Sequence, residues 1–332
     1  MTTTIIVTGA TGYIAKHIIK SALEKGYKVV GTVRTSAKGE QVKKLFSNPA
    51  FEYEVVESLE QPGAFDKALK AHPETIAFLH AASSVIMNPT DPEKETLLPA
   101  VEGTKNALRA VHEHGRNVKH FVLTSSYIAN VNFSDPQSTA TEDTWNVLKW
   151  EDAIANPSFA YPVSKTYAEK AAWDFVEKEK PQFSLTTANP AYVLGPQAYG
   201  EDAKDTLNLS AELISSLLKL KQGDDVPQTA GPAVDVRDVA KAQLDVLENE
   251  KLAGKRLLLV GYFFSQQLAL DLINKHYPEL HLPVGDPATA LNGKDEGISR
   301  YNVAKTQELL GYEFVGFEGS ILDLVKQYQE NN

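Results

Sequence analysis

A glycine-rich loop near the N-terminus, between a short strand and a helix, most constrains what this chain can fold into. Ile5-Ile6-Val7 is a β-branched run typical of a buried parallel strand. Residues 8–15 read Thr-Gly-Ala-Thr-Gly-Tyr-Ile-Ala, and a helical pattern follows up to Gly26. A second strand is expected over 27–33. This order of strand, glycine loop, helix and strand is the context that a dinucleotide-binding fingerprint requires.

The glycines of this loop let backbone N–H groups approach a pyrophosphate at the positive end of the helix. Their spacing is G-x-x-G-x-x-A, and Ala15 in the third place is small enough for close packing of helix on strand. The alternative is a tight turn with a purely structural role. The loop residues that we predict to bind the cofactor are Gly9, Thr11, Gly12, Tyr13 and Ile14.

A cation ends the second strand, where folds selective for NAD usually carry an acid that binds the ribose 2′-hydroxyl. Arg34 stands there, with Lys38 close behind. A guanidinium can bind a 2′-phosphate with two hydrogen bonds and stack on adenine, which favours NADPH. A solvated Arg at a strand end is the alternative. Glu57 either accepts a hydrogen bond from the adenine amine or lies at the surface.

The composition indicates a soluble globular protein and excludes several other classes. The 332 residues carry a net charge of −10, which argues against general binding to nucleic acid. There is no cysteine, so disulfides, thiol nucleophiles and cysteine metal sites are excluded, and we predict no metal. The N-terminus has no basic leader and no apolar run is long enough for a membrane span. We therefore expect a cytoplasmic protein.

The alternation of strands and helices predicts an α/β fold, namely a Rossmann-type doubly wound parallel sheet with a smaller, mostly helical C-terminal substrate lobe. We assign residues 1–190 plus 233–260 to the NADP-binding domain and 191–232 plus 261–332 to the substrate-binding lobe. Residues 189–196 are expected to form a rigid loop between them. Further strands are expected over 51–56, 75–79, 120–124, 183–188 and 256–260. Helices are expected over 97–114, 159–178, 207–220, 266–276, 303–310 and 321–329, with another that begins after 235.

Ser126 follows the strand over 120–124, and Tyr161 and Lys165 follow at a helical spacing of four residues. A free phenol has a pKa of ~10, and an ammonium one turn away favours the phenolate and lowers that pKa. A serine hydroxyl opposite can hold a carbonyl oxygen while the phenol protonates it. Alone, such a Tyr/Lys pair is usually an amphipathic surface pair, and we take the second copy, Tyr301 and Lys305, as structural.

Small and polar residues at strand ends complete the predicted cofactor contacts. They are Ala81, Ala82, Ser83 and Thr124, with Tyr161 and Lys165 contacting the cofactor as well. His80 is expected to be a packed histidine at the end of its strand. Glu169 is expected to be an ordinary solvated charge. Asp235 to Asp238 is expected to be a salt-bridged helix start with Arg237 between the acids, although two acids so close can also suggest a metal site.

With these motifs in order, and with Asn189-Pro190 as well, the chain resembles the extended short-chain dehydrogenase/reductase family over nearly its whole length. It is similar to the dihydroflavonol-reductase-like branch and to the yeast NADPH-dependent methylglyoxal/3-methylbutanal reductases and related ketoreductases. The resemblance implies that Ser126, Tyr161 and Lys165 are catalytic and that Arg34 and Lys38 hold the 2′-phosphate. It also places Pro190 and Val193 by the nicotinamide. It places Val85, Val131, Val163 and Tyr192 in the substrate pocket.

Two positions depart from the family pattern. Glu57 stands where the family has an Asp after the third strand, and Val85 and Val131 are aliphatic where related reductases can carry aromatic residues. A wider pocket is the expected consequence. We expect an NADPH-dependent reductase of aldehydes or ketones, acting on a small carbonyl substrate as a monomer or homodimer. The alternatives are a sugar-nucleotide epimerase or dehydratase that retains NAD, and a non-catalytic NADP(H)-sensing protein.

Overall fold

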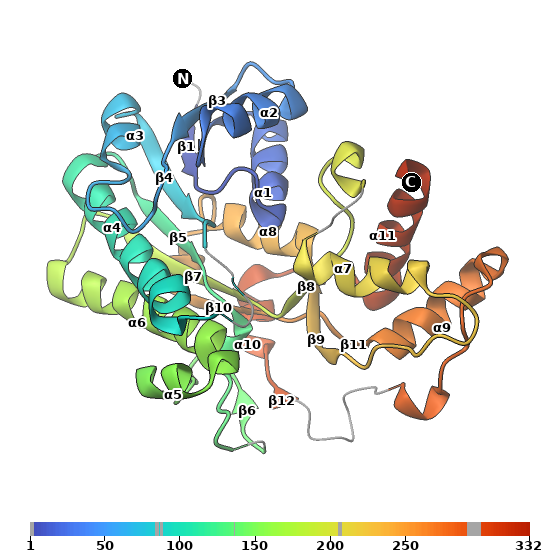
Figure 1. Ribbon diagram of the computed structural model, residues 1–332. Coiled ribbons are helices and arrows are strands. Elements are labelled where there is room, and N and C mark those ends of the chain that lie inside the picture. The colour runs from blue at the N-terminus through green and yellow to red at the C-terminus, as the bar shows by residue number, and fades with distance from the viewer. Residues whose placement is uncertain (1–2, 84–85, 87–88, 136, 205–207, 291–299) are drawn as a thin grey trace.

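The computed structural model describes residues 3–83, 86, 89–135, 137–204, 208–290 and 300–332 (Figure 1). Within those ranges, no helix is both long and apolar enough to cross a bilayer.

In the described part of the chain, the main sheet has seven strands, all paired in parallel, in the order β10-β7-β5-β4-β1-β2-β3. The chain runs outward in one direction from β1 to β3 and in the other from β4 to β10. The crossover therefore lies between β1 and β4, and ligands bind at the carboxyl ends of the strands at such a point. The strands are β1 (Thr4–Val7), β2 (Lys28–Val33), β3 (Phe51–Val55), β4 (Thr75–His80), β5 (His120–Thr124), β7 (Ser184–Pro190) and β10 (Arg256–Leu259).

Helices cover both faces of this sheet (Figure 1). Ile5 and Val7 of β1 belong to the apolar cluster under one layer of helices, and Ile6 belongs to the cluster under the other. A strand buried on both faces needs an uninterrupted apolar run, which explains the sequence of β1. One layer contains α1 (Tyr13–Glu24), α2 (Ser36–Phe46) and α8 (Val236–Asp245), and the other contains α3 (Asp66–Ala71), α4 (Leu98–His114) and α6 (Ala160–Glu179).

A second, three-stranded sheet lies beside the first, in the order β11-β9-β8. Among the described residues, β8 pairs with β9 in parallel and β11 with β9 antiparallel. Its apolar cluster contains Leu194, Phe264 and Ile321. The strands are β8 (Tyr192–Leu194), β9 (Ala230–Asp235) and β11 (Tyr262–Ser265), and the helices packed with them are α7 (Leu209–Ser215), α9 (Gln266–His276) and α11 (Phe317–Asn331).

The prediction of a rigid loop over 189–196 is wrong, because most of these residues lie in strands. Asn189 and Pro190 complete β7, and 192–194 form β8. Pro190, which has no N–H to donate, is the last residue of β7, and the amide of Ala191 donates to Leu259 of β10 instead. Shorter elements occupy the connections: β6 (Thr139–Ala140), β12 (Arg300–Tyr301), α5 (Trp150–Ala155), α10 (Ala304–Leu310), a π-helical turn at Glu93–Leu97, and 3₁₀ turns at Tyr127–Asn130, Pro157–Phe159, Gly200–Ala203, Ser216–Lys219, Glu250–Leu252, Pro278–Leu280 and Pro287–Thr289.

Candidate active site

The glycine loop joins β1 to α1 at the carboxyl edge of the main sheet. Gly9 has φ +70°, and a Cβ placed there would lie 3.0 Å from the Cα of Ala82, so this position requires glycine for both conformation and space. Gly12 caps the start of α1 and is exposed together with Thr11, while Tyr13 and Ile14 are half-buried. Ala15 is buried in the core, as its small size predicts. Gly12 accepts from the amide of Lys16 at 2.9 Å, so the helix amides before Lys16 have no carbonyl partner within α1, and they suit a phosphate group.

A buried hydrogen-bond chain ties the loop to the end of β4. The Thr8 hydroxyl accepts a hydrogen bond from the amide of Ala82 at 3.0 Å and lies 3.0 Å from Nδ1 of His80. Burial, with the nearby charge of Lys165, lowers the pKa of His80 to about 3. His80 is therefore neutral, and the expectation of a packed strand-end histidine is confirmed. Ala81, Ala82 and Ser83 follow, all half-buried along this edge.

The two cations predicted to bind the 2′-phosphate are exposed at the carboxyl edge of the main sheet. Arg34 directly follows β2, Lys38 lies in the first turn of α2, and both are exposed. Within the described ranges, neither side chain forms a hydrogen bond or ion pair with the protein. Glu57 is also exposed, two residues after the end of β3. Two unpaired cations beside the glycine loop fit a ligand that carries a further phosphate.

Ser126 and Tyr161 come together through their side chains. Ser126 follows β5 and is 9% exposed, and Tyr161 lies in the first turn of α6. The Ser126 hydroxyl is close enough to Tyr161 to favour the phenolate, yet burial outweighs this effect and raises the pKa of Tyr161 above its usual value. The net shift is therefore opposite to the lowering predicted from Lys165, because the half-buried Tyr161 phenol has too little solvent to stabilise its charge.

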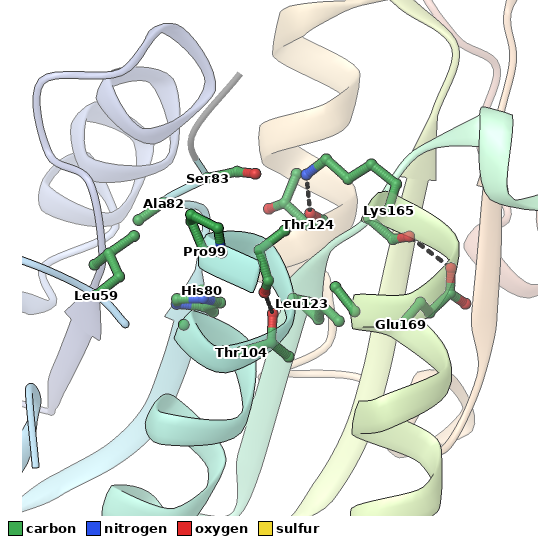
Figure 2. A pocket seen from close by; sticks show the side chains of 14 residues that line it. Leu59, His80, Ala82, Ser83, Pro99, Thr104, Leu123, Thr124, Lys165 and Glu169 are labelled. Atoms are coloured by element: carbon green, nitrogen blue, oxygen red, sulfur yellow. Dashed lines mark hydrogen bonds between the residues drawn. The ribbon is translucent and has the colours of Figure 1, made fainter. Parts of the chain in front are cut away.

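Lys165 lies one turn after Tyr161, and Figure 2 shows its ammonium group reaching the end of β5. Nζ donates a hydrogen bond to the carbonyl oxygen of Thr124 at 3.3 Å. The Thr124 hydroxyl in turn donates to Oε1 of Gln243 on α8 at 2.9 Å. Burial lowers the pKa of Lys165 to about 8, against the opposing charge of Glu169. The group is thus a poorly solvated cation that a nearby anion would stabilise.

A pocket opens between β4, β5, α4 and α6 (Figure 2). Thr124 and Lys165 line one side, and Ala82 and Ser83 line another. The predicted cofactor contacts from three separate segments are thus brought to one cavity. Its lining is completed by Leu59, His80, Pro99, Ala100, Gly103, Thr104, Leu123, Ser125, Ala168 and Glu169.

The residues predicted from the resemblance to surround nicotinamide and substrate are spread over several environments. Pro190 and Val193 are buried where β7 passes into β8. Tyr192 is 42% exposed and close enough to Tyr161 to raise its pKa. Val131 is half-buried, and Val163 is fully buried in a cluster with Leu97 and Ala153. Val85 lies outside the described residues.

Glu169 is the residue that sequence reasoning missed. It is not a solvated charge, because its exposed fraction is 0% and Arg256 donates from Nε to its Oε1 at 2.6 Å. A signal was present in the sequence: Glu169 continues the four-residue spacing of Tyr161 and Lys165, so it lies on the same helix face. A single charged side chain in a helix with many charges did not stand out.

Two other expectations are confirmed away from this site, namely the salt-bridged helix start at Asp235 to Asp238 and the structural role of Lys305. Arg237 pairs with Asp235 at 2.8 Å and with Asp323 at 2.6 Å, so the acidic segment is a salt-bridged helix start. Lys305 binds Asp143 at 3.2 Å. In the part of the chain that the structure describes, no group of three or more His, Cys, Asp or Glu residues could hold a metal.

The doubly wound sheet, with the glycine loop and the Ser126–Tyr161 pair at its carboxyl edge, defines a Rossmann-type α/β protein. The chain belongs to the NAD dependent epimerase/dehydratase family, whose model matches residues 5–261. This membership confirms the predicted resemblance to the extended short-chain dehydrogenases/reductases.

Relatives match this chain over almost its full length. A putative NADPH-dependent methylglyoxal reductase of Candida albicans is 48% identical over 98% of each chain. An NADPH-dependent methylglyoxal reductase of Saccharomyces cerevisiae is 38% identical over 97% of each. A crystal structure of yeast methylglyoxal/isovaleraldehyde reductase complexed with NADPH superposes with a TM-score of 0.93, at 36% identity over 98% of each chain.

Proposed function

We propose that this protein is an NADPH-dependent carbonyl reductase that converts aldehydes or ketones to alcohols. The observation that carries the proposal is the approach of the Ser126 side chain to the Tyr161 phenol, with the buried ammonium of Lys165 one turn further along α6. A hydroxyl pair beside a buried cation suits the protonation of a carbonyl oxygen. The reductase names of the full-length relatives support the same activity.

The free residues at the sheet edge fit NADPH. Gly9 and Gly12 shape the turn into α1, whose first amides suit a pyrophosphate, and Arg34 and Lys38 offer unpaired cations for a 2′-phosphate. We infer that Thr11, Tyr13, Ile14, Glu57, Ala81, Ala82, Ser83, Thr124, Pro190 and Val193 complete the cofactor site. When bound, NADPH supplies the hydride for the carbonyl carbon.

The protein's own side chains bind the carbonyl oxygen of the substrate and supply the proton. Ser126 and Tyr161 donate hydrogen bonds to the carbonyl oxygen. The raised pKa of Tyr161 keeps its phenol protonated at neutral pH, so a proton is present to be given. The charge of Lys165 then stabilises the phenolate that remains after Tyr161 has donated this proton. Val85, Val131, Val163 and Tyr192 are the proposed substrate contacts.

The domain assignment is part of the same proposal. Residues 1–190 plus 233–260 would bind the cofactor, and 191–232 plus 261–332 would cover the substrate. The apolar cluster around Phe264, which draws almost all its residues from 191–232 and 261–332, supports this division. A cytoplasmic location and a monomeric or homodimeric state stay predictions.

The two alternative functions have less support. An epimerase or dehydratase that retains NAD would be expected to carry an acid after β2, where Arg34 stands. A non-catalytic sensor has no need of the Ser126–Tyr161 contact.

Oxidation of NADPH, followed by absorbance, tests the proposal. Methylglyoxal, 3-methylbutanal, an aryl ketone and a dihydroflavonol are the carbonyl substrates, and NADH is the cofactor control. Turnover with NADPH that greatly exceeds turnover with NADH is the expected result. Purification with tightly bound NAD would favour the epimerase instead, and tight NADPH binding without turnover of any of the four would favour the sensor.

A further inference from the structure

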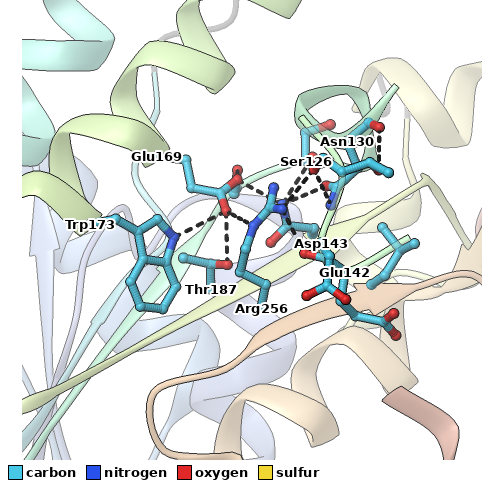
Figure 3. A network of polar contacts seen from close by, with 12 residues as sticks. Ser126, Asn130, Glu142, Asp143, Glu169, Trp173, Thr187 and Arg256 are labelled. Carbon is cyan, nitrogen blue, oxygen red and sulfur yellow. Dashed lines mark hydrogen bonds and ion pairs between the residues drawn. The ribbon is translucent and has the colours of Figure 1, made fainter. Parts of the chain in front are cut away.

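Glu169 is a fully buried carboxylate at the centre of a polar network (Figure 3). It lies on α6 one turn after Lys165 and two turns after Tyr161. Its Oε2 accepts hydrogen bonds from Ser125 Oγ at 2.5 Å and Asn189 Nδ2 at 2.7 Å. Its Oε1 accepts from Arg256 Nε at 2.6 Å, Thr187 Oγ1 at 3.1 Å and Trp173 Nε1 at 3.3 Å. So many donors, one of them charged, indicate an ionised carboxylate.

Two of these donors lead directly to Ser126. Ser125 precedes it in the chain, and Asn189 Nδ2 also donates to the backbone oxygen of Ser126 at 3.3 Å and to Oδ1 of Asn130 at 2.9 Å. The three neighbours of this amide nitrogen are all acceptors, so the orientation of the Asn189 side chain is fixed. Glu169 thus holds the backbone on both sides of the Ser126 hydroxyl that meets Tyr161.

Arg256 extends the network to the segment after Ser126. Its Nη1 donates to the carbonyl oxygens of Glu142 at 2.6 Å and Thr144 at 2.7 Å. Its guanidinium carbon lies 3.7 Å from the centre of the Trp145 ring. The side chain is only 10% exposed and Glu169 is completely buried, so the ion pair is dry. Two strands, one helix and one loop therefore meet at a single buried charge pair.

The same carboxylate is the anion beside Lys165, and its charge opposes the lowering of the Lys165 pKa by burial. His80, at the end of β4, is a further titratable group close to Lys165, whose charge contributes to lowering the His80 pKa. His80 is neutral above a pH of about 3. Glu169 is thus the charge that favours the protonated state of Lys165.

We propose that Glu169 is a positioning residue for carbonyl reduction, acting through Ser125 and Asn189 on Ser126 and through its charge on Lys165. This inference rests on the function proposed above. Glu169 is fully buried, so its carboxylate acts through the side chains that bind it. Its role is to fix the distance between the Ser126 hydroxyl and the Tyr161 phenol, which stand on different elements.

A matched pair of variants tests the positioning. Ser125→Ala and Thr187→Val each delete one buried neutral hydroxyl that donates to Glu169, and both keep the ion pair with Arg256. Only Ser125 adjoins Ser126. Because a small displacement of reacting groups is costly, we expect Ser125→Ala to lower kcat at least roughly tenfold and Thr187→Val to change it less than about twofold. NADPH affinity, measured by fluorescence titration, and Tm should change equally in the two.

A second measurement needs no turnover. In protein with ¹³C-labelled lysine, Glu169→Gln should move the NMR titration of Lys165 to lower pH, with the resonance assigned by Lys165→Arg. An unmoved titration, or equal kcat values for Ser125→Ala and Thr187→Val in an active wild type, would overturn the positioning role and leave the proposed function intact. An inactive wild type would instead overturn both. If Glu169→Gln does not fold, the comparison of the two hydroxyl variants still decides.

Discussion

The Lys165 ammonium group lies 3.3 Å from the carbonyl oxygen of Thr124, so the helix that carries Tyr161 is tied to the end of the strand that precedes Ser126. The cation is buried and its pKa is lowered to about 8. Its charge state is therefore sensitive to pH in a range where many enzymes work. Activity and stability should respond to this titration in opposite directions.

Turnover should fall as pH rises through about 8, because Lys165 loses the charge that stabilises the Tyr161 phenolate. The stability contribution has the opposite sign. Between the folded pKa of about 8 and the usual lysine pKa of 10.5, the unfolded chain holds the proton and the folded chain does not, so stability rises with pH. Denaturant unfolding of wild type and Lys165→Met from pH 7 to pH 10 measures the difference, which should reach about 3 kcal/mol. If the unfolding free energies of the two proteins changed in parallel with pH, the lowered pKa of Lys165 would be contradicted.

Gly9→Ala should destabilise the protein more than Gly254→Ala. Both glycines have a positive φ, +70° and +72°, so both variants carry a similar backbone strain of about 1–2 kcal/mol. Only at Gly9 would the new Cβ meet a neighbour, the backbone of Ala82 at 3.0 Å. Overpacking adds a further ~1–3 kcal/mol, which denaturant unfolding can measure. Equal losses in the two variants would show that the loop can move away.

Arg34→Ala should narrow the preference for NADPH over NADH. Loss of a charge-assisted hydrogen bond worth ~1.5–3 kcal/mol lowers the ratio of kcat/KM values by at least roughly tenfold. Arg109→Ala is the control, since Arg109 is also exposed but lies on α4. An unchanged cofactor ratio in Arg34→Ala would remove Arg34 from the 2′-phosphate site.

Arg256→Met should be strongly destabilising, because it leaves the buried Glu169 carboxylate without its cation. Breaking a buried pair in this way costs about 3–5 kcal/mol. The exposed pair of Lys25 and Glu248, also close at 2.8 Å, provides the comparison, and Lys25→Met should cost less than about 1 kcal/mol. If thermal unfolding shows similar losses for both, the Arg256–Glu169 pair is not the structural centre described above.

The parallel core could be predicted from sequence because each strand carries its own signal. Ile5-Ile6-Val7 and His120 to Thr124 are apolar runs, and their ends place Gly9 and Ser126 at one sheet edge. Helix α2 was not predicted, because its segment contains few apolar residues, with Val42 and Phe46 buried beneath a polar surface. Its start at Ser36 is capped by the Thr35 side chain, which the sequence displays but does not distinguish from a loop.

The second sheet and the Glu169 network depend on contacts between distant segments. β8 has only three residues and pairs in parallel with β9, about forty positions later, so neither strand is evident locally. Glu169 becomes a buried anion only because Arg256 arrives from β10. Sequence could place the Ser126, Tyr161 and Lys165 side chains on their elements, whereas the polar network around them required the fold.

Tyr161→Phe gives the most direct test of the central claim, that the chain is a carbonyl reductase with Tyr161 as proton donor. The variant removes the phenol hydroxyl, which lies close to Ser126, and leaves the ring in place. Turnover of 3-methylbutanal with NADPH should fall by at least ~100-fold, while NADPH affinity by fluorescence titration stays the same. Wild-type turnover in the Phe variant would contradict the account.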